Sequence, residues 1–382
     1  MEDRKEENTL KEDVTLMTAT DLHYLSKELY DPQSEIFARL LENNDGKLIE
    51  GGPDILNALK EETLKVRPDA LLLSGDLTFN GELTSLKEMV PVLEEIEKAG
   101  IDVLVMSGNH DILYPYAATY FGDALGMTES ISPDLFRKNL AAFGFDEAIY
   151  KDELTLSYAY RIRDDLWILA LDGNDPKYPC MIPAQTLKWA EYVLQEAQKE
   201  HARVIVMSHQ NVLKQNEMMF NGYVLNNHEE VEALLKKYGV SLVLSGHSHL
   251  QHTSVDGSLT DVCTESAALY PLPYALVTIQ QGKEGFAYER RHLDILQKES
   301  LERFEDNVIR MVQKTIEEVS SDSLERAMLR DFAVKINTAY FSGDIDTVRA
   351  MGSSEERKLF QEKVKATFWG YYIERIFTEY CD

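Results

Sequence analysis

The stretch that decides the fold is VLVMSGNHD, residues 103–111, in which a short apolar run ends in glycine, asparagine, histidine and aspartate. Four apolar residues followed by two small ones indicate a buried strand whose chain turns sharply at its carboxyl end. The same arrangement recurs four times, and each apolar run leads, directly or through one or two small residues, into Asp or His. These runs with their motifs are Val14–Thr20 with Asp21-Leu22-His23, Ala70–Leu73 with Ser74-Gly75-Asp76, Val204–Met207 with Ser208-His209, and Leu242–Leu244 with Ser245-Gly246-His247-Ser248-His249.

Amphipathic stretches with helical spacing separate these runs. They are Asp54–Val66, Leu83–Lys98, Pro183–Lys199 and Glu229–Tyr238. Alternation of strands and helices predicts an α/β fold built on a largely parallel sheet. Because the carboxyl ends of parallel strands meet at one edge, the Asp, Asn and His side chains are expected to converge there.

Other stretches interrupt this alternation. The segment Asp111–Asp152 is rich in Tyr and Phe and is expected either to pack against the core or to form a lid or base-stacking wall over the site. The polar loop Asn211–Asn227 follows a motif directly and is a candidate for substrate contact. Short runs with turn signals at Ser157–Leu171 and Gln251–Leu293 look like hairpins, which suggests a second, more antiparallel sheet.

The C-terminal part of the chain has a different texture. Helical stripes run over Leu301–Val319 and Leu324–Ile336, and Ser353 followed by Glu356 is a capping-box signature that opens a third helical run. We therefore predict a charged lead-in at 1–13, a catalytic domain at 14–295 and a helical domain at 296–382. The helical domain contains no histidine, so we expect it to cap the site, to shape a groove or to mediate homo-oligomerisation.

Composition limits the partners. The 382 residues include 39 Lys and Arg against 66 Asp and Glu, a formal net charge of −27. Such a surface repels duplex nucleic acid and anionic membranes, but it admits a small anionic substrate wherever positive charge is supplied locally. The longest apolar run, Leu166–Leu171, is far shorter than the about 18 residues of a membrane span.

Cysteine usage and the amino-terminal residues bear on the compartment. The isolated cysteines argue against a disulfide framework and against a thiolate zinc site, and Met1–Asp13 lacks the apolar core of a signal peptide. A cytoplasmic location is expected for the chain as written, the alternative being export or membrane anchoring with a leader removed. The three cysteines are Cys180, Cys263 and Cys381.

The motifs as a set have the composition of a metal centre. Five of the nine histidines lie inside them, together with carboxylate and amide oxygens. This mixture of nitrogen and oxygen suits borderline divalent ions such as Mn, Fe or Zn, and it is too rich in nitrogen for a dedicated Ca²⁺ or Mg²⁺ site. Seven candidate ligands exceed the needs of one ion and suit two, which is a recurring device for displacement at phosphorus.

The pattern D-x-H, G-D, G-N-H-[DE], H, G-H-x-H is present in full and in order across residues 21–249. In this respect the chain resembles the calcineurin-like metallophosphoesterase family. The stretch GDLTFNGE, residues 75–82, is similar to the branch of class III cyclic nucleotide phosphodiesterases. The fold implied is a four-layer α/β/β/α sandwich of two mixed sheets. The resemblance implies that one metal ion would be held by Asp21, His23 and His249, and the other by Asn109, His209 and His247. Asp76 would bridge both ions. His110 would protonate the leaving group, and Asp111 would orient His110.

One departure narrows the choice of metal. Purple acid phosphatases have a tyrosine ligand three residues after the bridging aspartate, where this chain has Phe79. Two divalent ions are therefore expected, with Mn or Fe favoured and Zn as a further candidate. The implied activity is a phosphodiesterase that acts on cyclic nucleotides or small diesters through attack of a metal-bridging hydroxide. The alternatives are a phosphomonoesterase or nucleotidase, and a non-catalytic interaction module on the same fold.

Overall fold

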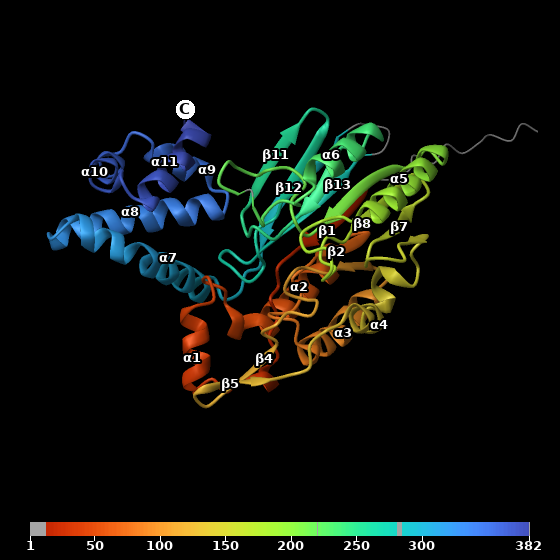
Figure 1. The fold of residues 1–382 in the computed structure, drawn as a ribbon, viewed down its shortest axis with the longest axis horizontal. Coiled ribbons are helices and arrows are strands. Elements are labelled where there is room, and N and C mark those ends of the chain that lie inside the picture. Colours follow the sequence, from red (N-terminus) through yellow and green to blue (C-terminus); the bar gives the residue numbers. More distant parts are fainter. Residues whose placement is uncertain (1–12, 220, 281–284, 382) are drawn as a thin grey trace, which may run out of the picture.

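The structure is a computed structural model that describes residues 13–219, 221–280 and 285–381 (Figure 1). Apart from Asp13, the charged lead-in expected at 1–13 lies outside the described residues. Two mixed β-sheets form the centre of the molecule. Among the described residues, no helix is long and apolar enough to cross a membrane.

The first sheet has the strand order β14-β13-β1-β2-β3. Its β1, β2 and β3 are parallel to one another, and β13 and β14 extend it as an antiparallel hairpin on the free side of β1. The bounds are β1 Val14–Ala19, β2 Ala70–Ser74, β3 Asp102–Met106, β13 Pro273–Ile279 and β14 Ala287–His292.

The second sheet has the order β11-β12-β10-β9-β8-β7-β6, with β8, β9, β10 and β12 parallel and the remaining strands antiparallel at its edges. Its strands are β6 Tyr150–Lys151, β7 Tyr158–Arg163, β8 Leu166–Leu171, β9 Arg203–Ser208, β10 Leu242–Ser245, β11 His252–Asp256 and β12 Leu259–Cys263.

Both sheets are mixed, as the family resemblance implies, but the second sheet is not more antiparallel than the first, because each has as many parallel as antiparallel strand pairings. The five strands that carry the motifs are shared between the two sheets, and so are the predicted hairpins. The apolar runs predicted that each strand is buried, but burial does not specify which strand lies beside it.

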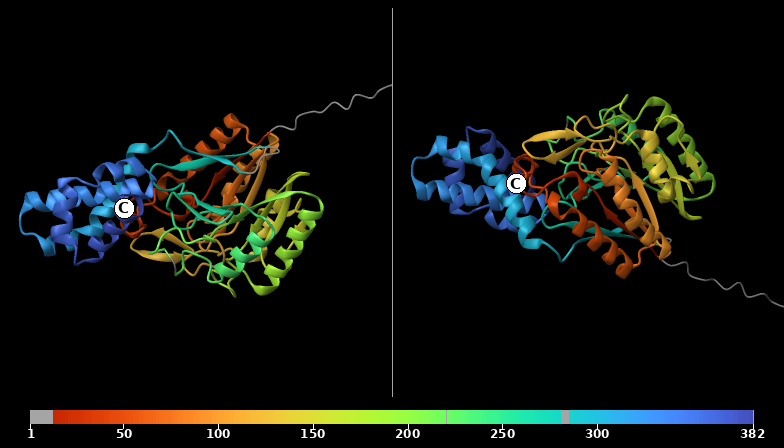
Figure 2. Two further views of the ribbon diagram at one scale, coloured as in Figure 1. Left: turned by 90° about the horizontal axis from the view of Figure 1, so that it is seen from above. Right: turned by 90° about the horizontal axis from the view of Figure 1, so that it is seen from below.

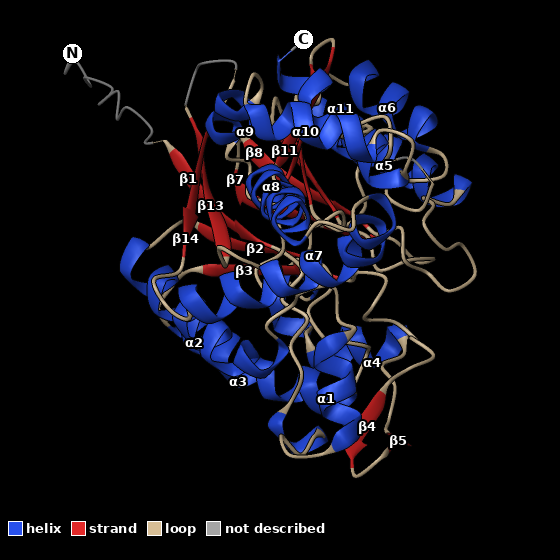
Figure 3. Cartoon of the chain, turned by 90° about the vertical axis from the view of Figure 1, so that its left-hand side faces the viewer, coloured by secondary structure: helices blue, strands red, loops and turns tan. Residues whose placement is uncertain are grey.

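Helices cover the outer faces of both sheets, which confirms the four-layer α/β/β/α sandwich (Figure 3). Strand β8 illustrates this layered arrangement, because its successive side chains point into two different apolar cores. Trp167, Leu169 and Leu171 pack towards the outer helices of the second sheet, whereas Ile168 and Ala170 pack between the sheets. The outer helices are α2 Gly52–Val66 and α3 Leu83–Lys98 on the first sheet, and α5 Ala184–Lys199 and α6 His228–Lys237 on the second.

The aromatic insertion after β3 serves mainly as packing. Phe136, Phe143 and Phe145 are buried in the core of the first sheet, and Tyr120 packs in a smaller cluster with Phe37 and Phe79. The remaining short elements are η1 Lys27–Leu29, α1 Glu35–Glu42, η2 Ile49–Gly51, β4 Ala118–Phe121, β5 Ala124–Met127, α4 Pro133–Asn139 and a π-helical turn, η3, at Ala141–Phe145.

The C-terminal helices gather at one end of the sandwich with an apolar core of their own (Figure 2). The third predicted helical run is divided in two, and its amino-terminal cap is Ser354 instead of Ser353, because the Ser354 hydroxyl accepts the Arg357 N–H. The chain turns between Val364 and Phe368 before it resumes as a helix. The five helices are α7 Gln297–Val319, α8 Ser323–Phe341, α9 Ile345–Met351, α10 Glu355–Val364 and α11 Phe368–Cys381.

Candidate metal centre

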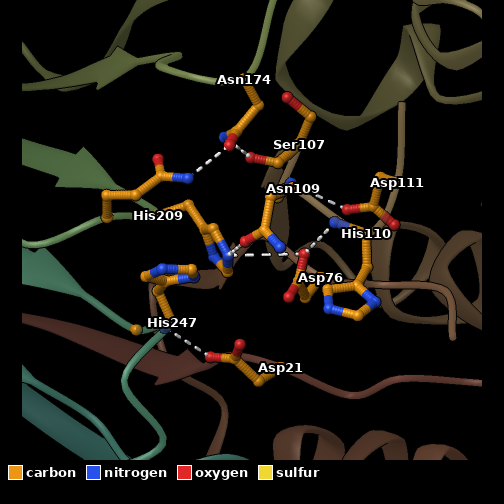
Figure 4. Close-up of polar contacts among 12 residues, drawn as sticks. Asp21, Asp76, Ser107, Asn109, His110, Asp111, Asn174, His209 and His247 are labelled. Carbon is orange, nitrogen blue, oxygen red and sulfur yellow. Dashed lines mark hydrogen bonds and ion pairs between the residues drawn. The ribbon is translucent and has the colours of Figure 1, made fainter. Parts of the chain in front are cut away.

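The carboxyl ends of β1, β2, β3, β9 and β10 meet where the two sheets face each other, and the motif side chains converge there (Figure 4). Two groups of potential ligand atoms form, with all atoms of a group within 4.8 Å of one another. One group contains Asp21, His23, Asp76 and His249, and the other contains Asp76, His209 and His247. Asn109 joins the second group, since its Oδ1 lies 3.1 Å from Nε2 of His209.

In the first group, imidazole nitrogens and carboxylate oxygens face one point. Nε2 of His249 lies 3.2 Å from Nε2 of His23 and 3.1 Å from Oδ1 of Asp21. Nε2 of His23 is also 3.7 Å from Oδ2 of Asp76. Two imidazoles that meet nitrogen to nitrogen beside two carboxylates form the donor set that a borderline divalent cation requires.

In the second group, the hydrogen bonds made by the far side of each ring indicate which nitrogen is a free ligand. Nδ1 of His209 lies 2.8 Å from the Ser74 carbonyl, so Nδ1 carries the proton and Nε2 faces the site. Nε2 of His247 lies 2.6 Å from the Gly222 carbonyl, which leaves its Nδ1 for coordination by the same reasoning.

Asp76 belongs to both groups through different oxygens. Its Oδ2 faces His23 in the first group, and its Oδ1 lies 3.4 Å from Nε2 of His209 in the second. The side chain is buried between them. Asp76 therefore faces both groups at once, one oxygen towards each.

The electrostatics of the groups fit divalent cations. Burial would raise the pKa of Asp76, but the His209 and His110 rings hold it well below its ordinary value. Burial would lower the pKa of His209, but Asp76 and Asp21 outweigh it and raise that pKa to about 9. Burial and the neighbouring His209 lower the pKa of His247 to about 4. The carboxylates thus draw a proton to His209 at a position where a metal ion would replace it.

The backbone at the site is held in an unusual conformation. Five of the expected ligands have left-handed φ values, which residues other than glycine seldom adopt and which cluster at functional sites. These are Asp21 at 53°, His23 at 43°, Asp76 at 48°, His247 at 66° and His249 at 55°.

Two motif glycines are required by close approach to the carboxylates. A Cβ on Gly108 would lie 2.1 Å from Oδ1 of Asp76, and a Cβ on Gly246 would lie 2.5 Å from Oδ2 of Asp21. Any side chain at either position would displace a carboxylate from its group. The small residues that end the apolar runs are therefore part of the site.

His110 lies beside both groups with its ring fixed on two sides. Its main-chain N–H donates to Oδ1 of Asp76 at 2.7 Å, and its ring stacks on Tyr114 at a centroid distance of 4.5 Å. Nδ1 lies 3.0 Å from both the Phe79 carbonyl and Oδ1 of Asn80, so it carries a proton. Burial lowers the pKa of His110, although Asp76 opposes this shift.

Asp111 is expected to orient His110, but its carboxylate makes no direct hydrogen bond to the His110 ring. The Asp111 carboxylate accepts the main-chain N–H groups of Leu77, Thr78 and Gly108 at 3.1, 2.8 and 2.8 Å, and it accepts the Thr78 hydroxyl at 2.8 Å. It thereby ties the loop after β2 to the loop after β3. The group positioned by Asp111 is the Asp76 loop, and the partners of the His110 ring are Phe79 and Asn80.

A cleft of about 550 Å³ opens from this site towards the C-terminal helices. Asp76, Asn109, His110, His247 and His249 lie on its site side. Lys47 also lines it, with its side chain only 5% exposed and its Nζ 3.4 Å from the exposed carboxylate of Asp45. The rest of the lining comes from Met218, Met219 and Tyr223 in the loop after β9, from Ser248 and Leu269, and from Phe304, Asn307, Met311, Asn337, Phe341, Phe368, Trp369 and Tyr372 in α7, α8 and α11.

The seven expected ligands and His110 lie together at this place, whereas no sequence motif indicated Lys47 or Phe368 in the cleft. Lys47 lies in a loop with no motif, and Phe368 begins a helix that carries no metal ligand. Of the aromatic insertion, Tyr114 stacks on the His110 ring beside the site, but none of the described residues 114–150 lines the cleft itself. The loop 211–227 does line it, through Met218, Met219 and Tyr223.

Known proteins share this fold and this family of motifs. Residues 15–251 match the calcineurin-like phosphoesterase family. A probable cyclic nucleotide phosphodiesterase of Ruthia magnifica subsp. Calyptogena magnifica is 44% identical over 57 residues, which are 15% of this chain and only 23% of that protein. A dimetal phosphatase from Danio rerio is 14% identical with a TM-score of 0.51, covering 74% of this chain and 97% of that one, which is a likeness of fold.

Proposed function

Because the chain belongs to the calcineurin-like phosphoesterase family, we propose that it is a metal-dependent hydrolase of phosphate esters, with cyclic nucleotides or other small diesters as substrates. The observation that carries this proposal is Asp76, whose two oxygens face two separate groups of ligand atoms. The preference for diesters is supported by the name of the Ruthia magnifica relative and by the similarity of residues 75–82 to the phosphodiesterase branch.

The residues proposed to hold two divalent ions are the two groups described above. Asp21, His23, Asp76 and His249 would hold one ion, and Asp76, Asn109, His209 and His247 the other. Bound there, Mn or Fe ions, or Zn as a further candidate, would supply Lewis-acid stabilisation of phosphate charge and would lower the pKa of water. Asp111 has a positioning role, since it fixes the loop on which Asp76 stands.

His110 is the proposed donor of a proton to the leaving oxygen. Its Nδ1 is engaged by Phe79 and Asn80, so Nε2 is the nitrogen free to meet a substrate. Donation from Nε2 requires the doubly protonated ring; burial lowers the pKa of His110 and disfavours this form, whereas the Asp76 carboxylate favours it.

Lys47 is the proposed partner of the substrate's phosphate. Its ammonium group is nearly excluded from water, and its carboxylate neighbour, Asp45, is 83% exposed on its side chain. A buried cation is stabilised by an anion in the same enclosure, and Lys47 lies on the cleft wall with His110 and Asn109. In a chain with a net charge of −27, this residue adds local positive charge where an anionic substrate would enter.

The function is tested by measuring turnover on the Mn²⁺-loaded chain. We expect hydrolysis of bis(p-nitrophenyl) phosphate and of cyclic nucleotides, with slower hydrolysis of nucleotide monoesters. Hydrolysis confined to monoesters would indicate a phosphatase or nucleotidase. Two bound ions without turnover of any ester would indicate an interaction module.

A further inference from the structure

The C-terminal helices contribute a wall of aromatic rings to the cleft. Trp369 and Tyr372 of α11 line it with their ring centroids 5.5 Å apart and their planes at 83°. Phe368 lies parallel to Tyr372, at a centroid distance of 6.0 Å and an angle of 4°. Phe341 of α8 adds a further ring.

Hydrogen bonds hold two of these rings in place. The Trp369 indole N–H donates to the Met311 carbonyl at 3.2 Å, and the Tyr372 hydroxyl donates to Oδ1 of Asn337 at 2.6 Å. Because the amide oxygen of Asn337 accepts that bond, its NH₂ group remains a donor at the cleft wall. The wall is therefore ordered before any ligand binds, which lowers the entropic cost of binding.

Phe368 is the ring that lacks cover. This residue is 68% exposed and lines the cleft. It is the first residue of α11, just after the turn that follows α10. Tyr371, three residues further along the same helix, is similarly exposed at 55% but does not line the cleft. An exposed ring beside a phosphate-ester site is a surface on which a flat ligand can stack.

The wall is connected to the metal centre through the loop after β9. Asn216 donates to the Tyr340 hydroxyl at 2.5 Å, and Glu217 pairs with Arg375. The same loop presents the Gly222 carbonyl to His247. Described residues of this loop thus contact both the C-terminal helices and His247.

We propose that this wall is a ring-binding subsite, which selects phosphodiesters whose organic group is a planar aromatic ring of the nucleobase kind. The inference rests on the proposed function for the phosphate end of the substrate, where Lys47 and the metal centre lie. Stacking on Phe368 and Trp369 would hold the ring, and the amides of Asn307 and Asn337 would meet its polar edge. A purely apolar chain would cover the NH₂ group of the buried Asn337 without giving it a hydrogen-bond acceptor, which is unfavourable.

The test compares two five-membered cyclic diesters that differ in the ring. Adenosine 2′,3′-cyclic phosphate and glycerol 1,2-cyclic phosphate are hydrolysed by the Mn²⁺-loaded wild type and by the variants Phe368→Ala, Phe368→Tyr and Tyr371→Ala. We expect wild type to prefer the adenosine substrate. The ratio of the two kcat/KM values should fall roughly five- to tenfold in Phe368→Ala through a higher KM, as when one stacking partner is removed. It should recover in Phe368→Tyr and remain at the wild-type value in Tyr371→Ala.

The outcomes separate this inference from the proposed function. Equal hydrolysis of both diesters by wild type, or the same ratio in Phe368→Ala as in Tyr371→Ala, would overturn the subsite and leave the phosphodiesterase proposal standing. Hydrolysis of neither diester, together with no hydrolysis of bis(p-nitrophenyl) phosphate or of 3′,5′-cyclic nucleotides, would overturn the proposed function. In that case equilibrium dialysis with adenosine 3′-phosphate decides the subsite: weaker binding in Phe368→Ala alone supports it, and equal binding in all variants rejects it.

Discussion

Replacing Gly108 by alanine tests how the loops hold the bridging carboxylate. The new Cβ would lie 2.1 Å from Oδ1 and 2.2 Å from the main-chain nitrogen of Asp76, whereas ordinary contacts begin at 3.4 Å. Asp76 must therefore move by about 1.3 Å, or the loop after β3 must move instead. A displacement of about 1 Å in a reacting group can lower the rate about 10²-fold, and crowding a packed site costs about 1–3 kcal/mol of stability.

The assay for Gly108→Ala measures kcat/KM on bis(p-nitrophenyl) phosphate, metal content and thermal unfolding on one preparation. The matched control is Gly52→Ala at the start of α2, where the nearest atom to a new Cβ lies 3.7 Å away. We expect a loss of at least about 10²-fold in kcat/KM with reduced metal content for Gly108→Ala, and wild-type values for the control. Wild-type activity and metal content in Gly108→Ala would refute the claim that Gly108 is required beside Asp76.

Three further changes test other parts of the protein. Lys47→Met removes the buried cation. We expect kcat/KM for diesters to fall about 10- to 100-fold while the metal content is retained. An unchanged kcat/KM would rule out a contact between Lys47 and the phosphate. His110→Ala should retain both ions and lose about 10²–10⁴-fold on a cyclic nucleotide, but much less on a p-nitrophenyl diester, whose phenolate needs little protonation; equal losses would argue against proton donation. Burial raises the pKa of Glu265 from 4.5 to about 8, although Arg290 opposes this shift. Between these two pH values the folded chain therefore binds more protons than the unfolded chain. As a result, the free energy of unfolding falls as pH rises through this window, by up to about 1.4 kcal/mol per pH unit. Urea unfolding of the chelated protein at several pH values should show a flatter dependence for Glu265→Gln than for wild type or the surface control Glu318→Gln, and parallel curves would contradict the buried, neutral carboxyl.

The ligands could be predicted from the sequence because each follows an apolar run at a strand end. Asp21 and His249 are 228 residues apart in the sequence, yet Oδ1 of Asp21 lies 3.1 Å from Nε2 of His249. The two residues meet because β1 and β10 end on the same side of the sandwich. The assignment of strands to sheets could not be predicted, because periodicity indicates burial and carries no information on which strands pair.

Asp111 and Lys47 show two further limits of local sequence reasoning. Asp111 follows His110 directly, but its carboxylate turns towards Leu77 and Thr78, because residues that are consecutive in a turn can point to different neighbours. Lys47 and Phe368 share no motif, and they line the same cleft because the C-terminal helices pack beside the site. Residues of this kind can be identified only from the three-dimensional structure of the cleft.

The bridging role of Asp76 is tested by measuring the metal content of Asp76→Asn. If Asp76 bridges two ions, the wild type should bind two divalent ions per chain, and Asp76→Asn should lose occupancy at both sites together with activity. A matched variant in the same cleft, Asp45→Asn, removes an exposed carboxylate and should keep both ions. Two ions per chain in Asp76→Asn would contradict the bridging role on which the account depends.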